Sequence, residues 1–189
     1  MPRWINVANL LTLLRLVLVP FVIHAILDGR HTLALALFAT AAFTDILDGA
    51  AARRFGLASA TGAYLDPIAD KCLLSGVYLA LALARMVPWW VAAIVLGRDV
   101  YILLGAALVR TFTGMGKFPP SIWGKACTLV QVVTGVTWMV RNMLGLPVLD
   151  ALASAMLWPC AAVTIGSGMH YTRRVMDGLR HIDGVPSGE

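Results

Sequence analysis

The sequence predicts an all-α, polytopic membrane protein with six transmembrane helices and both termini in the cytoplasm. Of its 189 residues, 59% are hydrophobic and only 13% are charged, whereas soluble domains carry roughly 25% charged residues. The mean hydropathy is +0.80. Apolar runs of about 20 residues, long enough to cross about 30 Å of hydrocarbon, recur along the chain. We therefore expect one transmembrane domain over residues 1–189, with 173–189 as a short cytoplasmic tail.

The first hairpin is expected from two apolar runs, 7–27 and 32–50. The polar group Asp28-Gly29-Arg30-His31 lies between them and predicts a tight turn. After the second run the chain continues through 53–63, a longer connection that is basic and contains glycine. Such connections commonly carry function, so this face of the membrane is the expected functional face.

The remaining runs predict two further hairpins. The third and fourth helices are expected over 64–84 and 89–110, joined at Val87-Pro88. A second long connection, 111–121, returns the chain to the functional face. The last two helices are expected over 122–141 and 149–171, and they meet at the turn Leu146-Pro147.

Basic residues gather at one face of this arrangement. With the N-terminus in the cytoplasm, nine basic residues lie on the cytoplasmic side, and three lie opposite. The cytoplasmic set is Arg3, Arg53, Arg54, Arg110, Lys117, Lys125, Arg173, Arg174 and Arg180, and the opposite set is Arg30, Arg85 and Arg141. The positive-inside rule predicts this orientation. A bacterial cytoplasmic membrane with the active site facing the cytoplasm is expected, and the net charge of +5 is not interpreted as nucleic-acid binding.

Four aspartates are concentrated in the second and third expected helices: Asp45, Asp48, Asp66 and Asp70. A lone carboxylate at membrane depth costs several kcal/mol, so such groups are retained for a partner or a function. The spacings of three and four residues place each pair on one helical face. Four facing carboxylates repel one another, and hard divalent cations compensate for that repulsion. Mg²⁺ or Mn²⁺ suits oxygen ligands, whereas the absence of clustered His or Cys argues against zinc.

Small residues and an arginine accompany these carboxylates. Gly49, Ala52 and Gly62 allow close approach of a helix or a ligand to the backbone. Arg53 provides a fixed cationic fork that suits a phosphate. Carboxylates, divalent metals and an arginine at a membrane surface together indicate phosphoryl-group chemistry on a lipid.

These residues also match a known pattern. Asp45-Ile-Leu-Asp48-Gly49-Ala-Ala-Ala52-Arg53, followed at fixed spacings by Gly62, Asp66 and Asp70, resembles in full the signature of the CDP-alcohol phosphatidyltransferases. Asn9-Leu-Leu-Thr12-Leu-Leu-Arg15 is similar to the usual opening of that family. The family's core of six transmembrane helices agrees with the hydropathy pattern.

The resemblance implies a set of roles for the matched residues. The four aspartates would bind two divalent cations, and Asp70 would also take the proton from the attacking hydroxyl. The CDP-binding residues it implies are Asp48, Gly49, Ala52, Arg53 and Gly62. The implied reaction moves a phosphatidyl group from CDP-diacylglycerol to an alcohol acceptor and releases CMP, in glycerophospholipid biosynthesis. The implied partners are CDP-diacylglycerol, a lipid or polyol-phosphate acceptor, membrane lipid and a second copy of the chain in a homodimer.

The acceptor is predicted from the later helices. Gly97-Arg98-Asp99-Val100 with Arg110, the series Ser121-x3-Lys125-x2-Thr128-x2-Gln131, and His170-Tyr171 look most like the CMP-forming cardiolipin synthases, whose acceptor is phosphatidylglycerol. The alternative is a phosphatidylglycerophosphate synthase, which uses glycerol 3-phosphate and usually carries Arg-Glu in place of Arg98-Asp99. Acceptor binding is expected at Arg98, Arg110, Lys117 and Lys125, since cations bind phosphates.

Two other interpretations of the four aspartates stay open. They could form a buried ion-pair network with Arg15, Arg53 and Lys71, which would also compensate carboxylates in lipid. They could instead bind the transported ion of a cation transporter. Transporters tend to show inverted repeats with matching interruptions in two halves, whereas all four aspartates here fall in one hairpin.

Overall fold

The computed structural model is all-helical over the part of the chain that it describes. That part comprises residues 7–55, 62–113 and 122–183, and it includes the side chains of 12–44, 69–108, 111 and 122–177. The helices are α1 (Val7–Leu27), α2 (His31–Phe55), α3 (Gly62–Leu83), α4 (Trp89–Thr113), α5 (Ile122–Leu144) and α6 (Pro147–Asp183). The all-α class and the order of six helices are thus confirmed.

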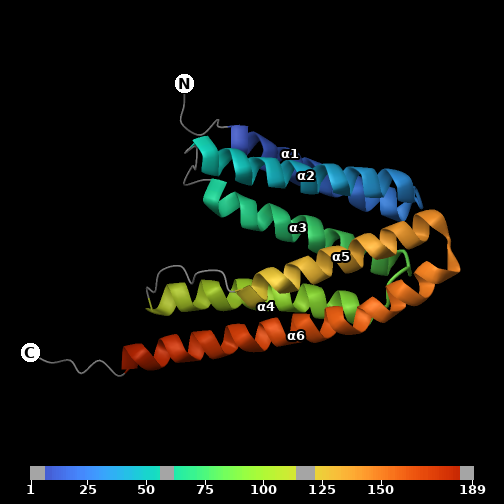
Figure 1. Ribbon diagram of the computed structural model, residues 1–189. Coiled ribbons are helices and arrows are strands. Elements are labelled where there is room, and N and C mark those ends of the chain that lie inside the picture. Colours follow the sequence, from blue (N-terminus) through green and yellow to red (C-terminus); the bar gives the residue numbers. More distant parts are fainter. Residues whose placement is uncertain (1–6, 56–61, 114–121, 184–189) are drawn as a thin grey trace, which may run out of the picture.

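The helices run up and down in one bundle (Figure 1). The short turns 28–30, 84–88 and 145–146 lie together at one end of the bundle, which we call the turn end. The end of α2 and the start of α3, which carry the predicted motif, lie at the opposite end, called here the motif end. Helix α1 packs against both α2 and α3, while α4 packs against α3 and α6. Helix α5 packs against α6 and also contacts α2 and α3.

Several helix ends differ from the predicted ones. Helix α2 continues to Phe55 rather than residue 50, and α4 continues to Thr113 rather than residue 110. The largest difference concerns α6, which continues to Asp183 rather than residue 171. The cytoplasmic placement of 173–189 stays a prediction. The prediction stopped where the apolar run stopped, but helix formation does not require apolar residues. At 1.5 Å per residue, α6 is about 55 Å long and exceeds the hydrocarbon thickness of about 30 Å.

The core is formed by one apolar cluster to which all six helices contribute. Its buried members include Val22, Ile26, Ala34, Phe38, Val77, Leu81, Val91, Val95, Met139 and Leu157. Close packing of α1 on α3 depends on Gly76, because a Cβ added there would lie 3.1 Å from Cδ1 of Ile23. Small residues at such crossings are typical of helix packing in membranes.

The outer surface is rich in large apolar side chains, among them Phe21, Phe43, Leu103, Leu129 and Trp158. Within the described residues, two helical segments meet a length and composition test for membrane spans, Trp89–Leu108 and Pro147–Asp177. Thr12–Leu27 and His31–Thr44 are shorter apolar helices. The number of six spans and the orientation of the termini remain predictions.

Candidate active site

The predicted motif spans the end of α2 and the beginning of α3. Asp45, Asp48, Gly49, Ala52 and Arg53 belong to the helical backbone of α2. Gly62 is the first residue of α3, and Asp66 and Asp70 follow in the same helix. The spacing argument required each aspartate pair to lie on a helix, and this context is confirmed. Apart from Asp70, the side chains of these residues lie outside the described part of the structure.

Asp70 is fixed by an arginine from another helix. Nη1 of Arg15, on α1, donates a hydrogen bond to Oδ1 of Asp70 over 2.7 Å. The Arg15 side chain is only 1% exposed, whereas the Asp70 side chain is 46% exposed. A guanidinium held between two helices can thus orient a carboxylate whose surface remains open to a ligand. Part of the predicted ion-pair network is therefore real, because Arg15 does pair with one of the four aspartates.

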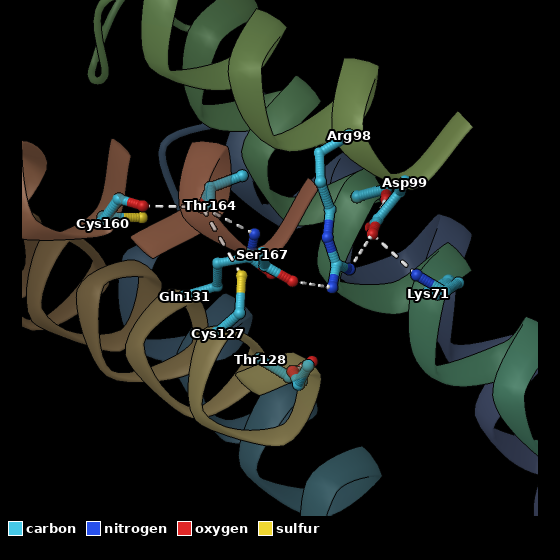
Figure 2. Close-up of polar contacts among 11 residues, drawn as sticks. Lys71, Arg98, Asp99, Cys127, Thr128, Gln131, Cys160, Thr164 and Ser167 are labelled. Carbon is cyan, nitrogen blue, oxygen red and sulfur yellow. Dashed lines mark hydrogen bonds and ion pairs between the residues drawn. The ribbon is translucent and has the colours of Figure 1, made fainter. Parts of the chain in front are cut away.

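The next residue on α3 faces a different partner. Nζ of Lys71 donates to Oδ1 of Asp99, on α4, over 2.7 Å. Nη1 of Arg98 donates to the same oxygen over 2.7 Å, and Oγ of Ser75 donates to Oδ2 over 3.3 Å. Nη2 of Arg98 donates to Oγ of Ser167, on α6, over 2.7 Å, so one cluster joins α3, α4 and α6 (Figure 2). These five residues are called here the Asp99 network.

The Asp99 network is deeply placed and carries excess positive charge. The side chains of Arg98 and Asp99 are each 9% exposed, and that of Lys71 is 38% exposed. Two cations face one carboxylate, so the network has a formal charge of +1. Charges at membrane depth usually pair with one another in this way. Lys71 therefore belongs to this network, and the expectation that it would balance the motif aspartates is not supported by its observed contact.

A second set of hydrogen bonds joins α5 and α6 one turn away. Nε2 of Gln131 donates to Oγ1 of Thr164 over 3.1 Å, and Thr164 donates to the carbonyl of Cys160 over 2.6 Å. The hydroxyl of Tyr78, on α3, donates to the carbonyl oxygen of Gln131 over 2.9 Å. Figure 2 shows Thr164 and Ser167 on the same helix, between the contacts with α5 and those with α4. Polar contacts thus connect α3, α4, α5 and α6.

The structure describes the side chains of two of the four predicted acceptor-binding cations, Arg98 and Lys125. Arg98 is engaged in the Asp99 network. Lys125 is exposed near the start of α5. Arg110 belongs to the helical backbone of α4, with its side chain outside the described residues, and Lys117 lies wholly outside them. Their binding roles stay predictions.

Sequence reasoning missed Ser75 and Ser167 as partners of charged residues, and Thr164 as the partner of Gln131. Their signal was weak but present: Thr164 and Ser167 are three residues apart, so they lie on one face of a helix. Small hydroxyl side chains are common on transmembrane helices, where many of them bond their own backbone. Only the packing of α4 and α5 on α6 shows that Thr164 and Ser167 form hydrogen bonds with side chains of other helices.

The donor set suits a divalent cation of the hard type. Asp70 presents a half-exposed carboxylate at the motif end, and the other three motif ligands are also carboxylates. Oxygen ligands of this kind favour Mg²⁺ or Mn²⁺. Among the described side chains, no group of three or more His, Cys, Asp or Glu residues comes together.

The chain is similar to known proteins of phospholipid synthesis. The family model described as CDP-alcohol phosphatidyltransferase matches residues 5–166. A Mycobacterium tuberculosis H37Rv protein named "Probable phosphatidylglycerophosphate synthase" is 37% identical over 190 residues, covering 97% of this chain and 86% of that protein. A Drosophila melanogaster protein named "Probable cardiolipin synthase (CMP-forming)" is 35% identical, covering 84% of this chain and 54% of that protein. The rat cardiolipin synthase (CMP-forming) is 30% identical, covering 93% of this chain and 64% of that protein.

Proposed function

The chain belongs to the CDP-alcohol phosphatidyltransferase family, and on that premise we propose that its acceptor is phosphatidylglycerol and its lipid product cardiolipin. Family membership makes the chain a membrane enzyme of phospholipid synthesis. The acceptor, the metal requirement and the roles of single residues are the proposed parts. Each is supported by a different observation.

The proposed base is Asp70. Its carboxylate takes the proton of the acceptor hydroxyl, and the hydroxyl oxygen attacks the phosphorus that bears diacylglycerol. The bond from that phosphorus to the oxygen of CMP breaks, so CMP leaves with both bonding electrons. The proton then passes from Asp70 to solvent. Support comes from the contact with Arg15, which orients a carboxylate that is still half exposed, as a general base requires.

The proposed metal ligands are Asp45, Asp48, Asp66 and Asp70, which would hold two Mg²⁺ or Mn²⁺ ions. When bound, such ions neutralise the pyrophosphate and stabilise CMP as the leaving group. The all-carboxylate donor set supports this assignment. The proposed contacts with the CDP moiety come from Asp48, Gly49, Ala52, Arg53 and Gly62, with Arg53 at the phosphates because a guanidinium binds phosphate in a bidentate manner.

The choice of phosphatidylglycerol as acceptor is supported by the hydrogen bonds that Arg98 makes within the protein. Both of its terminal nitrogens donate to protein groups, to Asp99 and to Ser167, and the ammonium of Lys71 also contacts Asp99. Glycerol 3-phosphate carries a dianionic monoester and needs several unengaged cations. The phosphodiester of phosphatidylglycerol carries a single negative charge and therefore needs fewer unengaged cations. The engagement of Arg98 and Lys71 thus favours the lipid acceptor.

Glycerol 3-phosphate is kept as the second candidate for a specific reason. The M. tuberculosis relative, named as a phosphatidylglycerophosphate synthase, is matched over 86% of its length. The fly and rat relatives, named as cardiolipin synthases, are matched over 54% and 64% of theirs. Arg110, Lys117 and Lys125 are the cations that would bind the phosphate of this smaller acceptor.

The test is a product analysis with the purified protein. CDP-diacylglycerol and Mg²⁺ or Mn²⁺ are supplied, phosphatidylglycerol and glycerol 3-phosphate are offered separately, and the lipid formed alongside CMP is identified. Cardiolipin from phosphatidylglycerol is expected. Phosphatidylglycerophosphate from glycerol 3-phosphate would overturn the acceptor but keep the reaction class. A parallel assay with a chelator tests the metals, since all CMP release should stop.

We also propose that the enzyme lies in a bacterial cytoplasmic membrane with the motif end facing the cytoplasm. The support is the charge bias of the sequence, which predicts nine basic residues on the cytoplasmic side against three on the other. A reporter domain fused after Glu189 should be active only when it is a cytoplasmic reporter. Activity of a periplasmic reporter at the same place would reverse the orientation.

A further inference from the structure

The turn end closes three helices with residues of left-handed backbone conformation. Helix α1 is followed by Gly29 with φ of 72°, α3 by Arg85 with φ of 57°, and α5 by Gly145 with φ of 62°. Across the described residues, Arg85 is the only non-glycine residue with positive φ. Glycine adopts this conformation readily, whereas a residue with a Cβ is strained in it.

The caps at Gly29 and Arg85 have the same hydrogen-bond pattern. The N–H of Gly29 donates to the carbonyl of Ile26 over 3.1 Å, and the N–H of Arg30 to that of Ala25 over 2.9 Å. Correspondingly, the N–H of Arg85 donates to Ala82 over 3.0 Å, and the N–H of Met86 to Leu81 over 2.8 Å. Both are Schellman caps, in which glycine is the usual residue at this position.

Available space does not explain why one cap carries an arginine. A Cβ added at Gly29 or Gly145 would meet no atom within 4 Å, so those positions also have room for a side chain. Glycine is used there because of its backbone. At Arg85 the chain keeps a long cationic side chain despite the unfavourable backbone conformation, which indicates that the guanidinium has a use.

Arg85 helps to line a hollow at the turn end. This hollow has a volume of about 480 Å³ and is lined by Arg85, Met86, Val87, Pro88, Trp89 and Trp138. Arg85 is exposed, and its side chain forms no hydrogen bond or ion pair with any other residue that the structure describes. The other two arginines of this end differ, since Arg30 lies 3.9 Å from Asp28 and Arg141 pairs with Asp150.

The surroundings of the hollow indicate which kind of anionic ligand Arg85 would bind. Leu83 and Trp89, on either side of the turn, are 51% and 52% exposed, so the rim is apolar and carries an indole of the type enriched at membrane interfaces. Trp138 adds a second indole ring to the lining of the hollow. Arginine binds phosphate in a bidentate manner. A soluble anion would use the guanidinium alone, whereas a lipid would use both the cation and the apolar rim.

We propose that this hollow binds the phosphodiester of an anionic phospholipid from the leaflet at the turn end, with Arg85 as the phosphate-binding residue. The hollow follows the Leu83 end of α3, whereas Asp70 lies nearer the Gly62 end of that helix. The hollow is therefore separate from the proposed acceptor site and does not depend on which acceptor the enzyme uses.

The test measures binding rather than turnover. Protein purified and delipidated in a neutral detergent is titrated with dioleoylphosphatidylserine, dioleoylphosphatidylcholine or inorganic phosphate, and thermal unfolding is followed. Phosphatidylserine is chosen because it is not a proposed acceptor. It should raise the Tm more than the other two ligands do. Arg85→Gln should bind it about tenfold more weakly, because a charge-assisted hydrogen bond is lost, and Arg85→Lys should retain part of the affinity.

Two further variants separate binding from stability. Arg30→Gln is the matched control, because it removes an arginine of the same end that does not line the hollow, and it should keep the full response. Arg85→Gly should raise the Tm of the lipid-free protein by about 2 °C, since it relieves the left-handed strain, but should lose the response to phosphatidylserine. All variants should release CMP at the wild-type rate in phosphatidylcholine.

Three results would overturn the proposal. The first is a full phosphatidylserine response in Arg85→Gln. The second is an equal response to inorganic phosphate, which would assign the hollow to a free anion rather than a lipid. The third is a lower Tm of lipid-free Arg85→Gly, because this would make Arg85 a structural residue whose side chain stabilises the turn without a ligand.

Discussion

Two aspartates on neighbouring helices show how the same side chain is used in opposite ways. Asp70, at the contact of α1 with α3, is half exposed and accepts a hydrogen bond from the buried Arg15. Asp99, at the contact of α3, α4 and α6, is 9% exposed and accepts hydrogen bonds from Lys71, Ser75 and Arg98. The first carboxylate is oriented and half exposed, and the second is enclosed by donors.

The difference in exposure suits Asp70 to a reacting role and Asp99 to a structural role. Both oxygens of Asp99 accept hydrogen bonds from protein donors, so a ligand would have to displace them. Asp70 keeps an exposed surface at the end of the bundle that bears the other three motif aspartates. Exposure combined with a buried orienting cation is therefore the feature that supports chemistry at Asp70, while saturation supports a structural role for Asp99.

The largest expected effect is at Asp70. Asp70→Asn should lower the rate of CMP release by about 10³-fold or more, because general-base catalysis typically contributes 10²- to 10⁴-fold. Binding of CDP-diacylglycerol should change little, since the amide has the same shape and its oxygen can still accept from Arg15. The measurements are CMP release at saturating substrate and calorimetric binding of the donor. Full activity of this variant would exclude Asp70 as the base.

Arg15→Lys is the matched positioning variant for this prediction. It keeps the positive charge but loses the planar fork that fixes the carboxylate. We expect a smaller fall, of about tenfold, in kcat with little change in the KM for either substrate, because geometry rather than binding is altered. An unchanged kcat would mean that Arg15 stabilises the fold without orienting Asp70.

A moderate effect is expected at Asp99. Asp99→Asn leaves Arg98 and Lys71 without a carboxylate, which should lower the free energy of unfolding by about 2–4 kcal/mol, near the lower end because Lys71 is partly exposed. Activity per folded molecule should fall much less than in Asp70→Asn. Denaturation in detergent followed by circular dichroism measures the first effect. Ser75→Ala, which removes only the 3.3 Å contact, is the control and should cost about 1 kcal/mol or less.

The smallest effect is expected at Tyr78, whose hydrogen bond links α3 to α5. Tyr78→Phe removes the hydrogen bond to the carbonyl of Gln131 and should lower the free energy of unfolding by about 1 kcal/mol. CMP release should stay at the wild-type rate. A loss of activity comparable to that of Asp70→Asn would contradict the assignment of this contact to structure alone.

The helices could be predicted from the sequence because their apolar runs are long and their turns carry polar residues or proline. The predicted starts at residues 7, 89 and 122 agree with α1, α4 and α5. The end of α6 could not be predicted in this way, since the run of Arg173, Arg174 and Asp177 leaves the apolar pattern while the helix continues. Hydropathy indicates where the apolar segment ends, but a helix can continue beyond that point.

The site could be predicted only in part. The motif predicted Asp70 and the helix that carries it. The partner choices of Asp70 and Lys71 could not be predicted. These two residues are adjacent, so they are turned by about 100° around α3 and face different helices, α1 and α4. Sequence spacing gives the angle between them but not which neighbour each one meets.

The helix cap at Arg85 could not be predicted from the sequence either. The sequence predicts a turn at Val87-Pro88, whereas the cap begins two residues earlier, at a position where no glycine signals a left-handed residue. Only the backbone reveals that Arg85 occupies the place that Gly29 has in the first hairpin.

The pairing of Arg98 with Asp99 has a consequence for how the chain enters the bilayer. Each charge alone, at the centre of an inserting helix, would oppose insertion by about 2.5–3.5 kcal/mol. Because the two residues are neighbours on α4, their contact can form within that segment before any other helix arrives. Among the side chains of α3 that the structure describes, none pairs with the ammonium of Lys71, which contacts Asp99 across the next turn. Helices α3 and α4 are therefore expected to leave the translocation machinery as one hairpin, with α6 and its Ser167 joining afterwards.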